Sequence, residues 1–272
     1  MYDVILSDKD IQKCSLKDKF MIYGYITKLL LKSKKRTYDV INNEYDLGVW
    51  NRDIEKIDFE TRSGNYNRSD LNDIIIFTHN DKLFKCIRST IEKKFDSILL
   101  SVLADYKEDS VVELGCGLGV NLFLLYKAGF RKLEGYDLSE NAISRVKQYS
   151  EKKEIHIHFG VHDLNQPFTE NMIKDKVVFT SACLEQCKLI MPNILKNIIK
   201  GRPKVVLNFE VDYDSSPLMV KKYFDACGYQ NNLVTELKKL EKQKKIEITS
   251  IEKLPLSLSP VNRLSAITWK VN

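Results

Sequence analysis

Three glycines and a carboxylate lie close together in the middle of the chain. The segment Val-Val-Glu-Leu-Gly-Cys-Gly-Leu-Gly at 111–119 places Gly115, Gly117 and Gly119 after an apolar stretch and before a helical one. Glycines in such a loop let the backbone turn tightly and approach a bound ligand closely. Glu113 precedes the first glycine by two residues, and its negative charge favours a cationic group, such as an ammonium, over a pyrophosphate.

Two further carboxylates follow at the ends of the next two predicted strands. Asp137, in Gly-Tyr-Asp-Leu-Ser, is placed to accept hydrogen bonds from both hydroxyls of a ribose. Asp163, in His-Asp-Leu, is placed to receive the amino group of an adenine. Amino-acid, ribose and adenine sites on successive strand ends together describe S-adenosylmethionine (SAM). NAD fits less well, because the third glycine of its loop would stand where this chain has Val120.

This set of residues resembles the cofactor half of a class I SAM-dependent methyltransferase, and the resemblance covers residues 110–272. It implies that Glu113 holds the amino group of the methionine portion and that the three glycines pack under the methionine and ribose portions. It also implies that Asp137 binds the ribose. The residues implied around the adenine are Tyr136, Leu138, Asp163 and the backbone of Leu164.

Acidic residues also follow the fourth and fifth predicted strands, where chemistry occurs in open α/β sheets. Glu185 and Glu210 are therefore candidates for orienting or deprotonating an acceptor, and His162 is a further candidate base. Glu185 is equally explained as an acid in the first turn of a helix, and Glu210 as part of a structural ion pair. We assign no metal site.

The last third of the chain also resembles bacterial methyltransferases of surface-polysaccharide and other small-molecule biosynthesis. The resemblance implies that Glu210, Tyr229 and Asn232 border the acceptor pocket, although Tyr229 and Asn232 also suit a turn and a helix cap. In the first hundred residues, Arg62 and Tyr66 are candidates for contact with an anionic or sugar acceptor, and surface-loop chemistry explains them as well.

These residues are positioned by an alternation of short apolar strands and helical segments that begins near residue 110. Such alternation requires crossover connections and predicts a Rossmann-like, doubly wound, mainly parallel seven-stranded sheet. The last strand, Ser265–Val271, is expected to run antiparallel. We expect a methyltransferase domain at 96–272 and a helical N-terminal extension, or lid, at 1–95. Helices are expected from about Asp81 to Tyr106 and from Leu184 to Ile199.

Composition excludes several classes of protein. The 272 residues are 43% hydrophobic and 29% charged with a net charge of +6, which suits a globular protein rather than a disordered chain or a dedicated nucleic-acid binder. No apolar run approaches the ~20 residues that span a bilayer, and the six scattered cysteines suit reduced thiols. We therefore expect a cytoplasmic enzyme with no membrane insertion.

The sequence favours SAM-dependent methylation of an oxygen on a small molecule or glycan precursor. An RNA or protein methyltransferase and a non-catalytic partner protein of the same fold are the alternatives, and we expect no nucleic-acid partner. The oligomeric state is left open.

Overall fold

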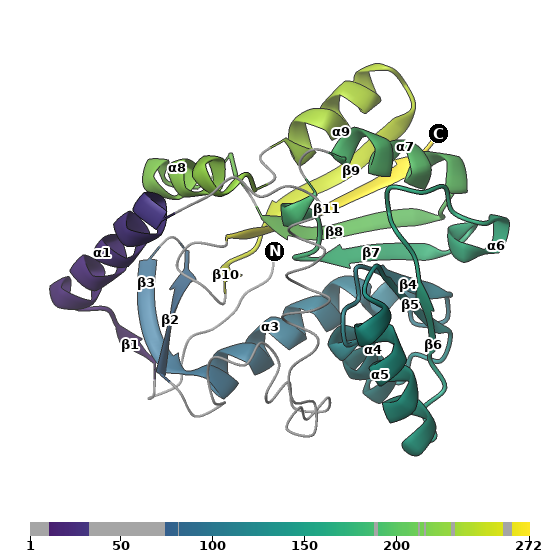
Figure 1. The fold of residues 1–272 in the computed structure, drawn as a ribbon, viewed down its shortest axis with the longest axis horizontal. Helices are drawn as coiled ribbons and strands as arrows, with labels where there is room; N and C mark the ends of the chain where they lie inside the picture. The colour runs from purple at the N-terminus through teal and green to yellow at the C-terminus, as the bar shows by residue number, and fades with distance from the viewer. Residues whose placement is uncertain are drawn as a thin grey trace.

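The computed structural model describes residues 11–32, 74–80, 82–187, 190–211, 213–214, 216–229, 232–257 and 263–272. Arg62 and Tyr66, two of the residues predicted to contact the acceptor, lie outside these ranges. The described residues form two sheets, one of seven strands and one of four, with helices packed around them (Figure 1).

The seven-stranded sheet has the order β6-β5-β4-β7-β8-β11-β9. The first five of these strands pair in parallel, and β11 runs antiparallel to both β8 and β9. This confirms the Rossmann-like, mainly parallel sheet and its antiparallel last strand. Its strands are β4 (Val111–Leu114), β5 (Leu133–Asp137), β6 (His158–Val161), β7 (Val177–Ser181), β8 (Val205–Val211), β9 (Ile246–Lys253) and β11 (Leu264–Val271).

Helices cover both faces of this sheet, as the buried side chains require. Successive residues of a strand point to opposite faces, so Val111 packs in one core and Val112 in the other. The first core also receives α3 (Arg88–Leu103), α4 (Val120–Lys127) and α5 (Glu140–Lys152), and the second receives α7 (Met191–Gly201) and α9 (Leu233–Lys242). Three short helices complete this part: η3 (Ala104–Tyr106), α6 (Glu170–Ile173) and η4 (Leu184–Gln186).

The four-stranded sheet is antiparallel, in the order β1-β3-β2-β10. It lies beyond the carboxyl ends of β7 and β8, and α1 packs beside α8 at its outer side (Figure 1). The N-terminal extension is thus not purely helical, and the expected boundary at 95/96 falls within α3. The strands of the four-stranded sheet are β1 (Gln12–Lys13), β2 (Ile74–His79), β3 (Lys82–Ile87) and β10 (Leu256–Ser257), and the two helices at its outer side are α1 (Leu16–Lys32) and α8 (Leu218–Cys227).

Two predicted helices begin later than expected. Residues 82–87 form β3 because they pair with β2 across a turn in which Asn80 adopts a left-handed φ of 45°. The spacing of Leu83, Ile87 and Ile91 continues the helical pattern of α3 backwards into this strand, which is why periodicity alone misplaced the boundary. The helix predicted from Leu184 begins only at Met191, since Pro192 is compatible with a first helical turn but not with an interior.

Candidate active site

The loop between β4 and α4 turns tightly because its three glycines adopt left-handed φ angles of +72° at Gly115, +51° at Gly117 and +68° at Gly119. The N–H groups of Gly115 and Cys116 both donate to the carbonyl of Tyr136, at 2.7 and 3.1 Å. The loop is thereby fastened to the end of β5, and Gly119 serves as the N-cap of α4.

Side chains at either end of this loop would collide with the rest of the protein. A Cβ atom on Gly115 would lie 2.0 Å from Sγ of Cys183, which follows β7. A Cβ on Gly119 would lie 2.7 Å from the ring of Phe159 on β6. Gly115 and Gly119 are therefore required both by their backbone conformation and by the close approach of one residue after β7 and one on β6.

Glu113 is almost completely buried in β4, and Asn121 in the first turn of α4 fixes its orientation. The amide Nδ2 of Asn121 donates to Oε1 of Glu113 at 2.6 Å. Removing a carboxylate from water is costly unless hydrogen bonds or a cation compensate it. A buried, oriented carboxylate of this kind suits the ammonium group of the methionine portion of SAM.

Asp137 ends β5, and its half-buried carboxylate connects the glycine loop to the start of α5. Oδ2 accepts the N–H of Gly117 at 2.8 Å, and Oδ1 accepts the N–H of Ser139 at 2.9 Å. Each carboxylate oxygen can accept a second hydrogen bond, so donors from a ribose fit this position as well. Glu113 thus suits the ammonium group of SAM, and Asp137 suits its ribose hydroxyls.

The residues expected around the adenine follow β5 and β6. Asp163 forms a turn in which its Oδ1 accepts the N–H of Asn165 at 2.8 Å, and the Leu164 carbonyl accepts Nδ2 of Asn197 at 3.2 Å. Leu138 stays 37% exposed directly after Asp137, so its side chain is accessible to a ligand.

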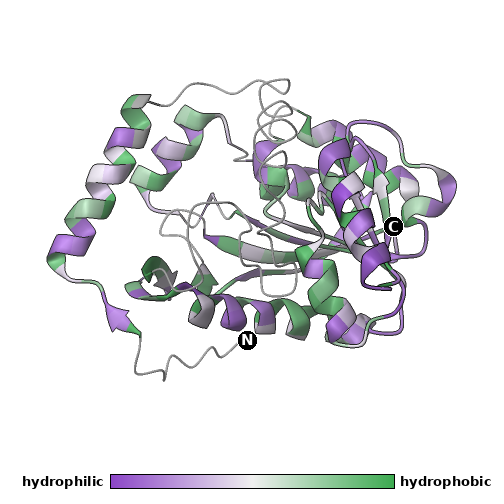
Figure 2. Cartoon of the chain, turned by 60° about the horizontal axis from the view of Figure 1, so that its bottom comes forward, coloured by the Kyte–Doolittle hydropathy of each residue, from purple (hydrophilic) through white to green (hydrophobic). Residues whose placement is uncertain are grey.

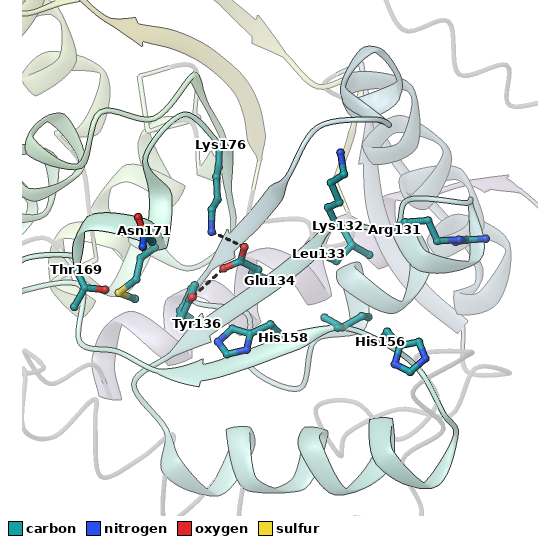
Figure 3. Close-up of a pocket in the computed structure, with 12 residues that line it drawn as sticks. Arg131, Lys132, Leu133, Glu134, Tyr136, His156, His158, Thr169, Asn171 and Lys176 are labelled. Carbon is teal, nitrogen blue, oxygen red and sulfur yellow. Dashed lines mark hydrogen bonds and ion pairs between the residues drawn. The ribbon is translucent and has the colours of Figure 1, made fainter.

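The Tyr136 side chain lies elsewhere, in a cavity of about 720 Å³ near the amino ends of the strands (Figure 3). Its hydroxyl donates to Oε2 of Glu134 at 3.0 Å, and Nζ of Lys176 donates to the other oxygen of Glu134 at 2.5 Å. The charged groups at the centre of this cavity therefore pair with one another. What Tyr136 gives the glycine loop is its backbone carbonyl.

On the acceptor side, Glu210 is completely buried near the end of β8 and holds the segment that follows β7. Oε1 accepts the N–H of Cys183 at 3.2 Å, and Oε2 accepts the N–H of Leu184 at 3.1 Å. The Thr180 hydroxyl is a third hydrogen-bond partner. Burial raises the pKa of Glu210 to about 8, because the hydrogen bonds offset only part of the desolvation and the nearby Glu185 adds repulsion.

A chain of buried polar side chains continues from Glu210 across three strands. Asn208 donates from Nδ2 to Oγ1 of Thr180 at 3.0 Å and accepts Nε1–H of Trp269 at 2.8 Å. All of these side chains are fully buried, so each hydrogen bond replaces contacts with water. This series of hydrogen bonds links β11, β8 and β7 and ends at the carboxyl group of Glu210.

The carboxylates of Glu185 and Glu210 are thus brought to the segment that touches the glycine loop. Glu185 lies in η4 and is 9% exposed, and Gln186 donates to its Oε1 at 3.3 Å. Cys183, whose Sγ reaches Gly115, has a pKa well above its usual value because of a hydrogen bond with Cys187 and burial. The thiol is therefore protonated at neutral pH and does not compete as a nucleophile.

The structure does not bring His162 to these carboxylates. It follows β6, and four strand spacings of about 4.8 Å separate β6 from β8, or roughly 19 Å. The His162 ring packs on Phe168 with centroids 4.7 Å apart, and burial lowers its pKa. Among the described residues, its Nε2 has no hydrogen-bond partner. His162 remains a candidate on the adenine side only.

Tyr229 and Asn232 stand where the chain passes from one face of the large sheet to the other. The Tyr229 ring packs against Tyr223 and Phe224, with centroids 5.8 Å apart in each case, on the side of the first core. Asn232 is the N-cap residue of α9, whose Leu233 enters the second core. Both are compatible with a role beside the acceptor.

The sequence alone did not identify the residues that hydrogen-bond to Glu113 and Glu210, directly or through one another, and so fix their orientation. Asn121 had a signal, because it is a single amide among the apolar residues that open α4. Thr180, Asn208 and Trp269 lie in strands expected to be buried, and no local pattern identifies the hydrogen-bond partner of a polar side chain within such a strand.

Comparison with known proteins agrees with this arrangement. Residues 111–200 match the family model of a methyltransferase domain. The PH0226 protein of Pyrococcus horikoshii OT3 is 18% identical with a TM-score of 0.52, and the match covers 68% of this chain and 91% of that one. Magnesium protoporphyrin IX methyltransferase from Synechocystis PCC 6803, solved with bound SAH, is 13% identical with a TM-score of 0.54, over 87% and 100% of the two chains. These likenesses are ones of fold, and no curated protein matches the chain.

The fold, the glycine loop and the matched domain define a class I SAM-dependent methyltransferase. The chain is an enzyme of that class, and its methyl donor is S-adenosylmethionine. Within the described ranges, none of the helices has the length and apolar character needed to pass through a bilayer.

Proposed function

We propose that this enzyme transfers a methyl group from SAM to an oxygen of a small polar acceptor, a sugar or a phosphate-bearing precursor of a surface polysaccharide. The observation that carries the proposal is the position of two glutamates beside the segment that follows β7, whose Cys183 touches Gly115. Glu185 belongs to that segment, and the buried Glu210 accepts hydrogen bonds from its backbone. Bound SAM would supply a methyl group on a sulfonium. The acceptor oxygen would attack the methyl carbon in line with the carbon–sulfur bond, which breaks and releases S-adenosylhomocysteine. A hydroxyl needs a proton acceptor for this step, and a carboxylate supplies one.

In this proposal the cofactor is held by the residues at the ends of β4, β5 and β6. Glu113, kept in place by Asn121, binds the amino group, and Asp137 binds the ribose while it anchors Gly117. Leu138, Asp163 and the backbone of Leu164 enclose the adenine. Each role follows from the residue's position at a strand end and from its hydrogen-bonding capacity.

Glu210 is the proposed proton acceptor. A base works best when its pKa lies near the working pH, and the pKa of Glu210, about 8, meets that requirement. Because only the ionised form accepts a proton, turnover should rise with pH up to about 8. Glu185, which is slightly exposed, is the alternative acceptor and the natural comparator.

The four-stranded sheet, with α1 and α8, is proposed as the lid over the acceptor. It lies opposite the carboxyl ends of β7 and β8, which favours a small acceptor over a polymer (Figure 1). Tyr229 and Asn232 are proposed to border the acceptor, together with Arg62 and Tyr66. All six cysteines are free thiols, which supports a cytoplasmic location.

The test is transfer of labelled methyl from SAM into three pools separated from producing cells: small molecules and glycan precursors, RNA, and protein. We expect label in the first pool, absent with Asp137→Ala, and a product that mass spectrometry identifies as an O-methyl compound. Label in RNA or protein would overturn the acceptor class. SAM binding without transfer to any pool would instead indicate a non-catalytic protein of this fold.

A further inference from the structure

Helix α1 carries apolar residues on two sides. Ile22 and Ile26 are buried in the first core, which explains how the helix is attached. Away from that face, Leu16, Phe20, Tyr23 and Leu31 follow one another at intervals of four, three and eight residues, a spacing that places them along one side of a helix. We call these four residues the outer stripe.

The outer stripe faces solvent in the described part of the chain. Its side chains are between 52% and 83% exposed, and the neighbouring Met21 and Tyr25 are also more than half exposed. Isolated exposed apolar residues are common on protein surfaces, but several large ones along one side of a helix mark an interaction site. On that side of α1, Gly24 and Thr27 separate Tyr23 from Leu31.

Lysines border the outer stripe on both sides. On a helix with 3.6 residues per turn, Lys19 falls along one border, and the lysines along the other are Lys17, Lys28 and Lys32. The helix contains one acidic residue, Asp18, and this side chain faces inward. It accepts hydrogen bonds from Ser15 and pairs with Lys85 at 3.3 Å. The outward charge of α1 is therefore entirely positive.

The adjoining helix extends this character. α8 packs beside α1, and the two helices lie together at one end of the molecule (Figures 1 and 2). It begins with Leu218, which is 68% exposed, and continues with the exposed Lys222. Figure 2 shows apolar and polar residues alternating along α1.

We propose that α1 binds an anionic lipid surface, lying flat with the outer stripe in the boundary between headgroups and acyl chains. An apolar stripe with aromatic rings, flanked by lysines, is the pattern of helices that lie in a membrane interface. A protein partner would be expected to bury the stripe without needing a cation on each border. The proposal concerns surface binding, not insertion, and it does not depend on the acceptor proposed above.

Binding in this way would orient the enzyme. α1 and α8 lie beyond the carboxyl ends of the parallel strands, on the side of the four-stranded sheet (Figure 1). A bilayer held against α1 would therefore be nearer the acceptor side of the large sheet than its amino-end cavity.

The test is sedimentation of the full chain with vesicles of phosphatidylcholine alone and of phosphatidylcholine with about one-third phosphatidylserine. We expect at least tenfold stronger binding to the anionic vesicles, weakening as salt rises, since surface attraction is screened within about 10 Å at 0.1 M salt. The triple variant Leu16→Ser, Phe20→Ser, Leu31→Ser should lose at least tenfold in binding. Its SAM affinity and circular dichroism should match wild type, which shows that it folds.

The matched control replaces apolar residues exposed elsewhere, Ile74 on β2 and Ile251 on β9, by serine. This variant should bind vesicles as wild type does. Lys17→Gln with Lys28→Gln and Lys32→Gln should weaken binding and flatten its salt dependence.

Equal binding to neutral and anionic vesicles, or equal binding by the outer-stripe variant and the control, would overturn the proposal. So would a wild-type dimer that the outer-stripe variant converts to a monomer in sedimentation velocity while neither binds vesicles. That result would assign the stripe to a second copy of the chain.

Discussion

The two halves of the large sheet's carboxyl edge are built in different ways. At the ends of β4 and β5, the cofactor side is shaped by backbone: three left-handed glycines, and a carboxylate that accepts one N–H of the loop and one at the start of α5. At the ends of β7 and β8, the acceptor side is shaped by side chains buried below it, from Trp269 through Asn208 and Thr180 to Glu210.

Because of this difference, substitutions on the two sides should have different structural effects. A backbone turn is specified by a few neighbouring residues, so one substitution in the loop removes it directly. A polar network is specified by residues far apart in sequence, so its members are coupled and a change in one moves the others. The predictions below separate the two sides, from the largest expected effect to the smallest.

Glu210→Gln should lower turnover by roughly 10²–10⁴-fold while leaving the SAM dissociation constant unchanged, because it removes the proposed proton acceptor and no cofactor contact. Single-turnover kinetics with saturating SAM, together with calorimetric SAM titration, measure the two quantities. Glu185→Gln is the matched control and should retain most activity. Near-normal turnover of Glu210→Gln would leave Glu210 as an anchor of residues 183–184 alone.

Gly115→Ala should weaken SAM binding by roughly 10²-fold or more, which corresponds to about 3 kcal/mol. The new Cβ meets Sγ of Cys183 and the φ of +72° is strained for alanine. Gly24→Ala in α1 is the control, because nothing lies within 4 Å of its new Cβ. That variant should bind SAM normally and unfold at slightly higher urea concentration, since alanine favours helix by up to about 1 kcal/mol. Equal SAM affinity in the two variants would contradict the loop's role.

Asp137→Ala should weaken SAM binding by roughly 1–3 kcal/mol, because the ribose hydroxyls and the N–H of Gly117 lose an acceptor. Asp137→Asn, which keeps one oxygen, should lose less. An unchanged calorimetric affinity in Asp137→Ala would refute the ribose assignment and move the cofactor contacts elsewhere on the loop.

The stability of the acceptor side should depend on pH through Glu210. Its pKa in the folded protein, about 8, lies above the ordinary value of 4.5, so the folded state holds a proton that the unfolded state releases. The free energy of unfolding should therefore fall as pH rises from about 5 to about 8, by at most about 1.4 kcal/mol per pH unit from this group. Urea unfolding at pH 5.5 and 8 measures the slope.

Glu210→Gln should flatten that slope, because glutamine does not titrate. The comparison between variant and wild type also cancels the opposite contribution of His162, whose lowered pKa favours the folded state as pH rises. The same slope in both proteins would show that other groups account for the pH dependence.

Much of the fold could be predicted because its signals are local. The alternation of buried strands with amphipathic helices was sufficient to predict the parallel sheet. Ser139 predicted the start of α5, where its hydroxyl accepts the N–H of Ala142 at 3.0 Å. The boundary at Arg88 could not be predicted, because β3 exists through its pairing with β2 and its own residues suit a helix equally well.

The sequence by itself determined the glycine loop and the strand-end carboxylates, since left-handed turns and strand ends depend on a residue and its immediate neighbours. Only the tertiary structure decided which groups support them. Asn121 on Glu113, Cys183 against Gly115, and the buried connection from Trp269 to Glu210 join residues up to 68 positions apart. Such contacts form when the strands assemble, and no local pattern encodes which buried polar side chains will then face one another.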